Sequence, residues 1–448
     1  DANEFTMTHI AGDPTEGPTG GYVFSENTEI GGLNFTSEVR NTTSGPTGPI
    51  WYRTATSGDT LYALANYNLP DLAGTDLTLE FAQNNSDITV KDNVITPTVF
   101  YRSVDGGQTF DQSDSLLPGY GDSSQRFRGV ADQYAIDARD SIVAIAITRS
   151  NRRIDLWKST DAGNTWNRTT VRALGIGTDQ FLTGEWGETD TLEGIVTNRG
   201  DTFSYVQPAD TLNDGSISTV IDDQGTVHLT WANVITARFA GLPSPISEGQ
   251  PLSNDTSEIT QPYLPALNVI QYWNGDKNEI VNAGRAPTLG GPDDSTYTTP
   301  AEGVAYSVSA STRPMLSYLS SDTLFIVYEG AVANTDPNIG PEVDNDYRDI
   351  YVVHSVDGGN SWSEPQNITE NATDNRESAY PSVAKRVTDS QVHLIWQEDD
   401  LPGSAVGEIG IQSRPISNDI FYTNINIDNI LADSVSTTDP TNPGGGDP

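Results

Sequence analysis

Residues 103–110 read SVDGGQTF, residues 159–166 read STDAGNTW, and residues 355–362 read SVDGGNSW. The three octapeptides share the order Ser-x-Asp-x-Gly-x-Thr/Ser-aromatic, and each follows a short run of β-forming residues. An Asp side chain can accept hydrogen bonds from the backbone of its own turn, and a Gly supplies a positive φ. The pattern therefore predicts three copies of one β-hairpin corner, with the terminal aromatic ring folded back onto a core.

Strand-like runs repeat around these corners. Residues 227–231 (VHLTW) match residues 392–396 (VHLIW), and comparable second-strand runs lie at 61–64, 141–145 and 324–328. First-strand runs lie at 313–318 and 380–384, and a third-strand run at 419–422 has no octapeptide after it. Short strands separated by polar turns and repeated in this way predict an all-β chain built from repeated sheets.

The octapeptide resembles the Asp-box, S-x-D-x-G-x-T-W, of the sialidase-like (BNR-repeat) β-propellers. The resemblance implies a β-propeller of four-stranded antiparallel blades, in which the box joins the third and fourth strands of a blade, away from the active site. It gives a structural role, and no catalytic one, to nine residues: Asp105, Gly107, Phe110, Asp161, Gly163, Trp166, Asp357, Gly359 and Trp362.

The repeats also predict the blade count and the domain limits. Five units are visible, and residues 173–212 hold two further strand-like runs that fit a degenerate blade, so we expect six blades, with five or seven as alternatives. The last unit lacks a fourth strand, which residues 4–8 are expected to supply, since ring closure removes an open sheet edge. Residues 1–432 are assigned to the propeller. Residues 433–448, rich in Pro and Gly, are assigned to a tail or to a linker toward a further domain.

Composition excludes several classes of function. The 448 residues include 62 Asp and Glu, 23 Lys and Arg and no Cys, for a formal net charge of −39. This balance argues against binding nucleic acid by neutralising phosphates, and against docking on anionic lipid. No apolar run approaches the roughly 18–20 residues of a membrane span, so no membrane insertion is expected. A chain of this size without Cys, beginning at Asp1, suits a secreted bacterial protein.

The residues of a sialidase site are not recognisable in the sequence. The resemblance would require three arginines that clamp a carboxylate, a Tyr nucleophile activated by a Glu, and an Asp acid/base. The Arg-Pro pairs at 313–314 and 414–415 lie late in the chain and lack the aliphatic residue of the family's Arg-Ile-Pro-like motif. Tyr380 lies near Glu377, but the same segment reads as a first strand. The catalytic residues therefore remain unknown.

Long loops are the expected place for a ligand. They fall at about 68–93, 235–266, 331–348 and 399–418, on the face opposite the octapeptides. Within them, Asp336, Asp344 and Asp346 concentrate hard oxygen ligands. Ca²⁺ is therefore a possible ligand, although no cofactor is required and a solvated acidic loop is the simpler alternative.

These observations favour a secreted, non-catalytic, sialidase-like propeller. We expect it to act as an extracellular binding or structural module at a bacterial cell surface, with a glycan or a protein as partner. The alternative is an exo-acting glycoside hydrolase, sialidase-like, whose catalytic residues have diverged.

Overall fold

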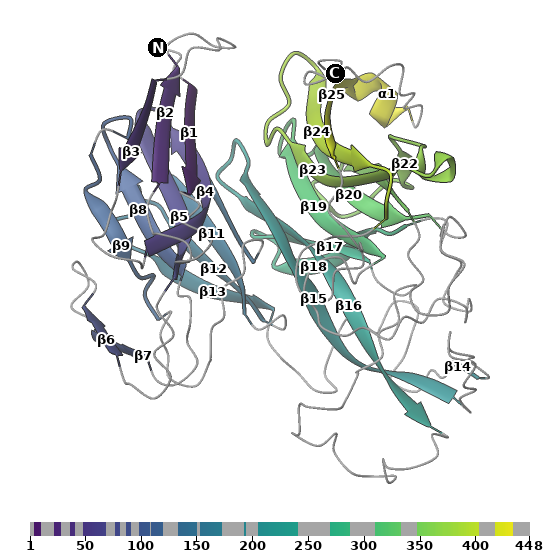
Figure 1. The fold of residues 1–448 in the computed structure, drawn as a ribbon. Helices are drawn as coiled ribbons and strands as arrows, with labels where there is room; N and C mark the ends of the chain where they lie inside the picture. The colour runs from purple at the N-terminus through teal and green to yellow at the C-terminus, as the bar shows by residue number, and fades with distance from the viewer. Residues whose placement is uncertain are drawn as a thin grey trace. The chain divides into compact units, whose positions relative to one another are not determined.

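The protein is described here from a computed structural model. The described residues are 4–9, 22–27, 36–40, 48–68, 77–80, 87–90, 98–107, 109–119, 133–149, 153–172, 192–193, 205–240, 269–286, 310–332, 347–402 and 417–432. Almost all of them lie in β-strands or in the tight turns between strands (Figure 1). No helix in this part of the chain is long and apolar enough to cross a membrane.

The chain is an all-β propeller of small antiparallel sheets, and five of these sheets are blades. The first blade has the strand order β4 (Gly48–Ser57), β5 (Thr60–Asn68), β8 (Thr98–Ser103), β9 (Gln112–Ser115). The second has β10 (Tyr134–Arg139), β11 (Ile142–Arg149), β12 (Arg153–Ser159), β13 (Asn167–Arg172). The third has β15 (Tyr205–Ile221), β16 (Val227–Ala240), β17 (Ile270–Asn274), β18 (Glu279–Gly284).

The last two blades follow the same order. The fourth has β19 (Ser311–Tyr318), β20 (Leu324–Ala331), β21 (Arg348–Ser355), β22 (Gln366–Asn367). The fifth has β23 (Glu377–Val383), β24 (Gln391–Asp399) and β25 (Asp419–Asn426), followed by the short helix α1 (Ile427–Leu431). Each octapeptide joins the third strand of its blade to the fourth.

The remaining strands bear on the number of blades and on the closure of the last blade. Five blades are found, which is one of the alternatives to the expected six. The segment expected to be a degenerate blade joins the third sheet, because β14 (Leu192–Glu193) pairs with the start of the long strand β15. β1 (Glu4–His9) pairs with β2 (Tyr22–Asn27), which pairs with β3 (Thr36–Arg40), and β6 (Leu77–Glu80) pairs with β7 (Asp87–Val90). Closure of the last blade by the N-terminal strand stays a prediction, and residues 433–448 lie outside the described residues.

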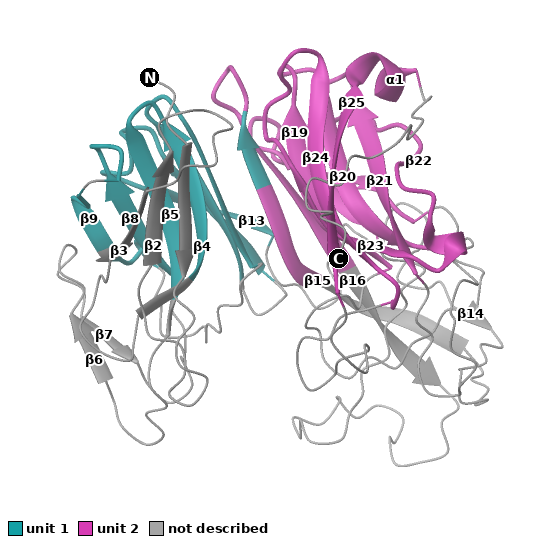
Figure 2. Cartoon of the chain, turned by 45° about the horizontal axis from the view of Figure 1, so that its top comes forward, with its two compact units in different colours: residues 1–172, 219–221 teal, residues 173–218, 222–448 magenta. Residues whose placement is uncertain are grey.

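The chain divides into two compact units, drawn in different colours in Figure 2. Unit 1 contains the first two blades, which share one hydrophobic core that includes Tyr62, Phe100, Tyr134 and Trp157. Unit 2 contains the other three blades except for residues 219–221 at the end of β15, which belong to unit 1. In unit 2 the fourth and fifth blades share a core around Phe325 and Trp396, which α1 extends.

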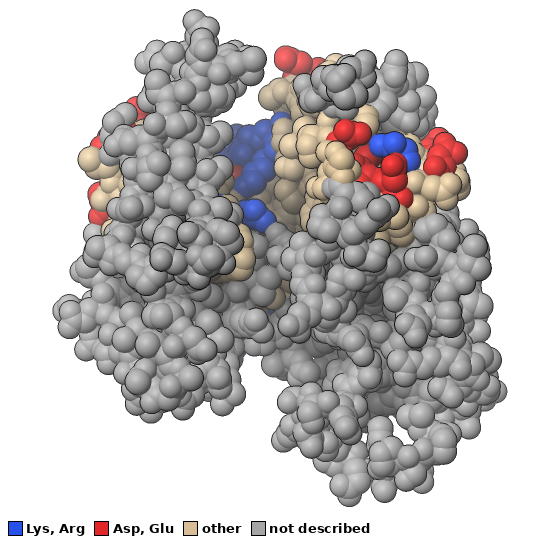
Figure 3. Space-filling model, viewed as in Figure 1, with Lys and Arg blue, Asp and Glu red and all other residues tan. Residues whose placement is uncertain are grey.

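On part of the described surface, charged side chains lie beside partners of opposite sign. Red and blue side chains are neighbours on part of the face drawn in Figure 3. In unit 2, Arg376 Nε lies 3.0 Å from a carboxylate oxygen of Glu398, and Arg376 Nη1 lies 3.5 Å from Asp400. Arg376 is 36% exposed, so water screens these pairs and each contributes little stability.

Each octapeptide is closed by its own Ser and Asp. In the third copy, Gly359 N donates to Ser355 Oγ at 2.9 Å, and Ser355 Oγ donates to Asp357 Oδ1 at 2.8 Å. The backbone N of Ser361 donates to Asp357 Oδ1 at 3.0 Å, and Ser361 Oγ donates to Asp357 Oδ2 at 2.6 Å. The same four hydrogen bonds recur around Asp105 and Asp161. The carboxylates of the three aspartates therefore cap the turns.

These hydrogen bonds favour the charged form of each Asp. Hydrogen bonds from Thr109 lower the pKa of Asp105 to about 2, and those from Thr165 lower the pKa of Asp161 to about 2. For Asp357, burial raises the pKa, but the hydrogen bonds from Ser361 and Ser355 outweigh it and bring the pKa to about 2. A carboxyl with a lowered pKa stabilises the fold above its ordinary pKa of 3.8, and that contribution is lost as pH falls toward 2.

Substituting Asp357 tests this capping role. Asp357→Ala removes the acceptor of two backbone and two hydroxyl donors, but Asn360 and Ser361 are exposed and water can replace part of the loss. We expect the free energy of unfolding to fall by about 1 kcal/mol, measured in urea at pH 7. Asp357→Asn should also be less stable than wild type at pH 7, and that difference should shrink between pH 4 and pH 2. An Asn variant with a pH-independent deficit would contradict the capping role.

The Gly of the octapeptide packs on the preceding blade. Gly359 has φ +83°, and a Cβ there would lie 2.1 Å from Tyr272 Cε1 on β17. Gly163 has φ +83°, and its Cβ would lie 3.1 Å from Phe100 Cζ on β8. The closing rings meet the same aromatic residues edge-on, since Trp362 lies 5.0 Å from Tyr272 and Trp166 lies 5.2 Å from Phe100. One octapeptide thus shapes a turn and also fixes a blade-to-blade contact.

Alanine substitutions at two glycines distinguish the free-energy cost of left-handed backbone from the cost of a steric clash with a neighbouring side chain. Gly58 also has a positive φ, +56°, but a Cβ there meets nothing within 4 Å. Gly58→Ala should therefore lower the free energy of unfolding by about 1–2 kcal/mol, the cost of left-handed backbone alone. Gly359→Ala should add an overpacking cost of about 1–3 kcal/mol from Tyr272. Chemical denaturation compares the two, and equal losses would refute the close packing of Gly359 on Tyr272.

Candidate functional site

Three features among the described residues are candidate sites: the cations at the octapeptides, the buried His228 network, and the bulges of the first strands. The cations act between blades. Arg102 Nη1 on β8 donates to Ala162 O at 2.6 Å and to Asn164 Oδ1 at 2.9 Å. Lys277 Nζ, after β17, donates to Gly358 O at 3.3 Å and to Asn360 Oδ1 at 2.7 Å. The two cations bind equivalent atoms of two octapeptides, so their role is to hold neighbouring blades together.

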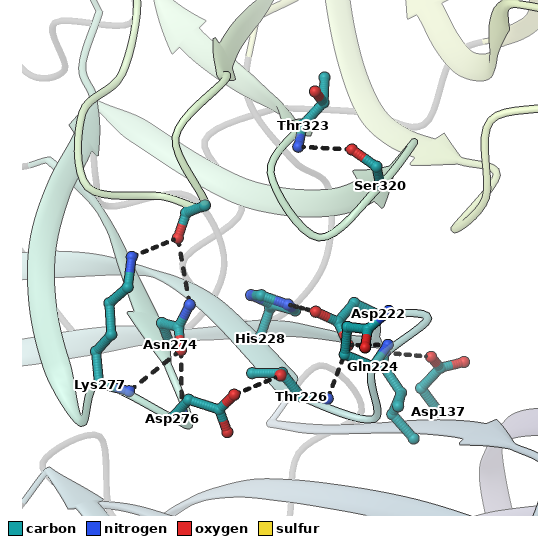
Figure 4. A network of polar contacts seen from close by, with 12 residues as sticks. Asp137, Asp222, Gln224, Thr226, His228, Asn274, Asp276, Lys277, Ser320 and Thr323 are labelled. Atoms are coloured by element: carbon teal, nitrogen blue, oxygen red, sulfur yellow. Dashed lines mark hydrogen bonds and ion pairs between the residues drawn. The ribbon is translucent and has the colours of Figure 1, made fainter.

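The second group is a buried polar network around His228 and Asp222 (Figure 4), which reaches the third octapeptide through Tyr272 and Gly358 O. His228 Nε2 lies 3.2 Å from Asp222 Oδ2, and His228 Nδ1 lies 2.6 Å from the hydroxyl of Tyr272. Burial raises the pKa of Tyr272 well above its ordinary value, so its hydroxyl stays protonated. Asp222, His228 and Tyr272 are each at most 2% exposed, which leaves no access for a substrate. On the fifth blade, His393 Nδ1 contacts the Tyr422 hydroxyl at 2.8 Å, so this pair is a repeated structural feature.

The third group lies on first strands, where three blades carry the same bulge. Trp51, Arg313 and Tyr380 have φ of +57°, +48° and +55°. At each of them two residues face one on the second strand, as the register of β4, β19 and β23 shows. Pro follows Arg313 and Tyr380, although a residue before Pro prefers extended backbone. Left-handed backbone at bulky residues costs about 1–3 kcal/mol each and is concentrated at functional sites.

In unit 2, two of these bulges meet on one carboxylate. Arg313 Nη1 donates to Glu329 Oε2 at 2.7 Å, and the backbone N of Tyr380 donates to Glu329 Oε1 at 2.5 Å. The guanidinium of Arg313 also lies over the Tyr380 ring, 4.1 Å from its centre. Glu329 is fully buried on β20, while the Arg313 side chain is 11% exposed and Tyr380 is half-buried. We call Arg313, Glu329 and Tyr380 the bulge cluster.

A second buried carboxyl is hydrogen-bonded to the residue that precedes Arg313 in the sequence. Asp214, on β15, accepts hydrogen bonds from Ser216 N at 2.9 Å and from the hydroxyl of Thr312, the residue before Arg313. Burial raises the pKa of Asp214, against the hydrogen bonds from Ser216 and Thr312 that favour its charged form. Asp214 precedes Gly215, which has φ +91°. The first strand of the third blade thus also carries left-handed backbone next to a buried polar group.

The bulge cluster is suited to holding a ligand in place. Each oxygen of the buried Glu329 accepts a hydrogen bond, one from a guanidinium and one from a backbone N–H, so the carboxylate holds Arg313 and Tyr380 in place. The half-buried Tyr380 ring, fixed by a left-handed backbone and an Arg, offers a rigid aromatic surface. Such a surface suits stacking against an apolar face of a ligand.

The structure separates the pair that the sequence brought together. Glu377 accepts a hydrogen bond from the backbone N of Arg348 at 2.6 Å, and the Glu bonded to the Tyr380 backbone is Glu329, fifty-one residues away. Sequence reasoning missed Glu329. The available signal was a carboxylate inside the run LFIVYEGA, where every residue is buried. Arg414 and the acidic loop residues Asp336, Asp344 and Asp346 lie outside the described residues, so the proposed calcium site stays a prediction.

Among the described residues no group of three or more His, Cys, Asp or Glu side chains is placed to hold a metal ion. Asp349 illustrates why buried carboxylates here are structural. Its Oδ1 accepts from Asn371 N and Ala372 N, both at 3.1 Å, and its Oδ2 accepts from Asn367 Nδ2 at 2.7 Å. Asn371 and Ala372 belong to the segment between the fourth and fifth blades, and Asn367 lies on β22.

Comparison with known proteins finds distant structural matches. No family model and no curated protein matches the sequence. A protein of unknown function from Dyadobacter fermentans is 10% identical, with a TM-score of 0.36 over 84% of this chain and 79% of that one. A sialidase of Trypanosoma rangeli in complex with sialic acid is 12% identical, with a TM-score of 0.37 over 94% of this chain. This chain covers 51% of that sialidase.

An ulvan lyase bound to a glucuronate–sulfated rhamnose unit is 11% identical, with a TM-score of 0.39 over 97% of this chain and 80% of that chain. These matched structures include a sialidase and a polysaccharide lyase. At these identities and scores the likeness carries no conclusion about activity.

The bulge cluster gives a clear stability prediction. Glu329→Ala leaves the poorly exposed Arg313 without this carboxylate and the Tyr380 N–H without its acceptor, which should lower the free energy of unfolding by about 3–5 kcal/mol. Glu329→Gln keeps an acceptor oxygen and should lose less. As a control, Asp419→Ala removes an exposed partner 3.9 Å from Arg376 and should cost less than about 1 kcal/mol. Urea denaturation measures all three, and a Glu329→Ala loss as small as that of the control would contradict the pairing.

Proposed function

We propose that this chain is a secreted, non-catalytic Asp-box propeller of the sialidase-like type, which binds an extracellular glycan at a bacterial cell surface. The observation that carries the proposal is the bulge cluster: Glu329, the buried carboxylate at the strained bulges, has both oxygens engaged, by Arg313 and by the Tyr380 backbone. A group so committed can position an aromatic surface but is poorly placed to transfer protons.

The octapeptides support the Asp-box part of the proposal. The Ser and Asp of each copy form the hydrogen bonds of the turn. In the second and third copies the Gly and the aromatic residue pack against the preceding blade. These uses match the structural role that the resemblance gives to the box, and they leave no side chain of the pattern for catalysis.

Aromatic side chains at the bulges support a glycan as the ligand. Trp51 is 37% exposed and Tyr380 is half-buried, and each is held by left-handed backbone at the bulge of its own blade. The apolar faces of sugar rings stack on such rings, while their hydroxyls pair with polar groups. The net charge of −39 opposes polyanions at low salt, which favours a neutral or weakly charged glycan.

One observation favours a second candidate, an exo-acting glycoside hydrolase. Burial raises the pKa of Asp214 above its ordinary value, and a raised pKa is a property of the general acid in glycoside hydrolases. Asp214 hydrogen bonds to Thr312, which places it next in sequence to the bulge residue Arg313. This candidate needs a second, ionised carboxylate with an open oxygen, a role that Glu329 does not fit.

Glycan binding and hydrolysis are measured on the same proteins. We expect the wild-type protein to bind members of a glycan array without cleaving sialosides or neutral oligosaccharides in long incubations. Tyr380→Ala should weaken binding about tenfold or more, the worth of one aromatic stacking contact. Tyr422→Ala, another half-buried Tyr on the same blade, is the matched control and should retain binding. Hydrolysis that Asp214→Asn abolishes would overturn the non-catalytic proposal and establish the second candidate.

A further inference from the structure

A cavity of about 280 Å³ lies beside the second octapeptide in unit 1. Its buried wall includes Phe100, Leu116 and Leu117, and its exposed side includes Asn164 and Thr165. Trp166, half-buried, lines it as well. A water molecule takes about 30 Å³, and protein interiors rarely hold voids larger than that, so this space exceeds a packing defect. Because exposed and buried residues both line it, a ligand can enter from solvent.

The chemistry of the lining selects an uncharged, amphipathic ligand. None of the residues that line the cavity carries a charge. The nearby cation, Arg102, is paired with Asp111 at 2.5 Å and donates to Asn164 and Ala162, so its charge is compensated. The polar groups of the lining are amides and hydroxyls, those of Gln112, Ser115, Asn164 and Thr165. Each also makes a hydrogen bond within the protein, so a ligand would use their remaining donor and acceptor positions. They stand beside aromatic rings, Phe100 and Trp166, whose centres are 5.2 Å apart at an interplanar angle of 83°.

We propose that this cavity binds one neutral sugar ring. Aromatic rings beside amides and hydroxyls match a molecule with an apolar face and a girdle of hydroxyl groups. Small-molecule sites usually span about 300–1,000 Å³, so a cavity at the lower limit takes a single ring and not a chain. The lack of charge in the lining disfavours sialic acid, whose carboxylate would require a cation. The site lies in unit 1 and shares no residue with the bulge cluster, so it does not depend on the proposed function.

The third octapeptide supplies a matched control. Asn360 occupies the place of Asn164: its Nδ2 donates to Asp357 O at 2.6 Å, and its Oδ1 accepts from Lys277 Nζ at 2.7 Å. Asn164 Nδ2 donates to Asp161 O at 2.6 Å, and its Oδ1 accepts from Arg102 Nη1 at 2.9 Å. Substituting either Asn therefore removes the same pair of structural contacts. Only Asn164 lines the cavity.

The experiment is a titration of the full chain with methyl glycosides of neutral hexoses and of N-acetylhexosamines. Binding is measured by calorimetry and by saturation-transfer NMR. We expect at least one neutral glycoside to bind. Asn164→Ala should weaken it about tenfold through loss of a hydrogen bond, while Asn360→Ala should not, although both lower the melting temperature alike. Trp166→Phe should also weaken binding, and its counterpart Trp362→Phe should not. This second pair keeps the test valid where an Asn variant fails to fold.

Three outcomes would overturn the proposal. The first is that no neutral glycoside binds. The second is that Asn164→Ala and Asn360→Ala weaken binding equally, which would assign the effect to general loss of stability. The third is that Tyr380→Ala, and not Asn164→Ala, abolishes binding, which would place the sugar at the bulge cluster. Conversely, loss of glycan binding in Tyr380→Ala with the methyl glycoside still bound would keep the two sites distinct.

Discussion

The hydrogen bond from Gly359 N to Ser355 Oγ, itself tied to Asp357, is the interaction on which the packing of one blade on the next depends. It holds Gly359 at a positive φ and so presents a backbone without a side chain to Tyr272. The ring of Trp362 then reaches the same Tyr. The second octapeptide repeats this arrangement against Phe100. The turn is therefore also a contact between two sheets, and the residues that meet there are distant in sequence.

The scarcity of cations explains how they are used. Against 62 acidic residues the chain has 23 Lys and Arg, and in the described residues many of these serve buried or half-buried acceptors. Arg153 and Arg168 both reach the fully buried Asp155 at 3.0 Å, and Arg313 reaches the fully buried Glu329. A buried carboxylate without a partner would be costly, so each one retained in a sheet requires a nearby donor. The excess negative charge is then left to the surface, where water and salt screen it.

The sequence predicted the parts of the molecule that carry a local signal and missed those that depend on contacts between strands. The five second-strand runs and the third-to-fourth-strand position of the octapeptides were predictable, because each has its own local signal of alternation and turn chemistry. The blade count was less accessible, because β15 is a single strand of 17 residues whose first part pairs with β14 and imitates a separate unit. The bulge cluster could not be predicted at all. Arg313 and Tyr380 stand before prolines, which indicates extended backbone, and only the register with β20 and β24 shows the left-handed turn.

That unpredictable element is also where strain is concentrated, and this bears on what the molecule does. Left-handed backbone at Arg313 and Tyr380 is retained because neighbouring strands hold it: Glu329 of the fourth blade binds the Tyr380 N–H of the fifth. A repeated sheet needs no such device, since β10 of the second blade runs through a regular register without one. The strain therefore serves something other than blade formation, and what it produces is an aromatic ring fixed over a guanidinium whose charge is already neutralised. A rigid, pre-organised surface lowers the entropic cost of binding, which is the requirement of a recognition site.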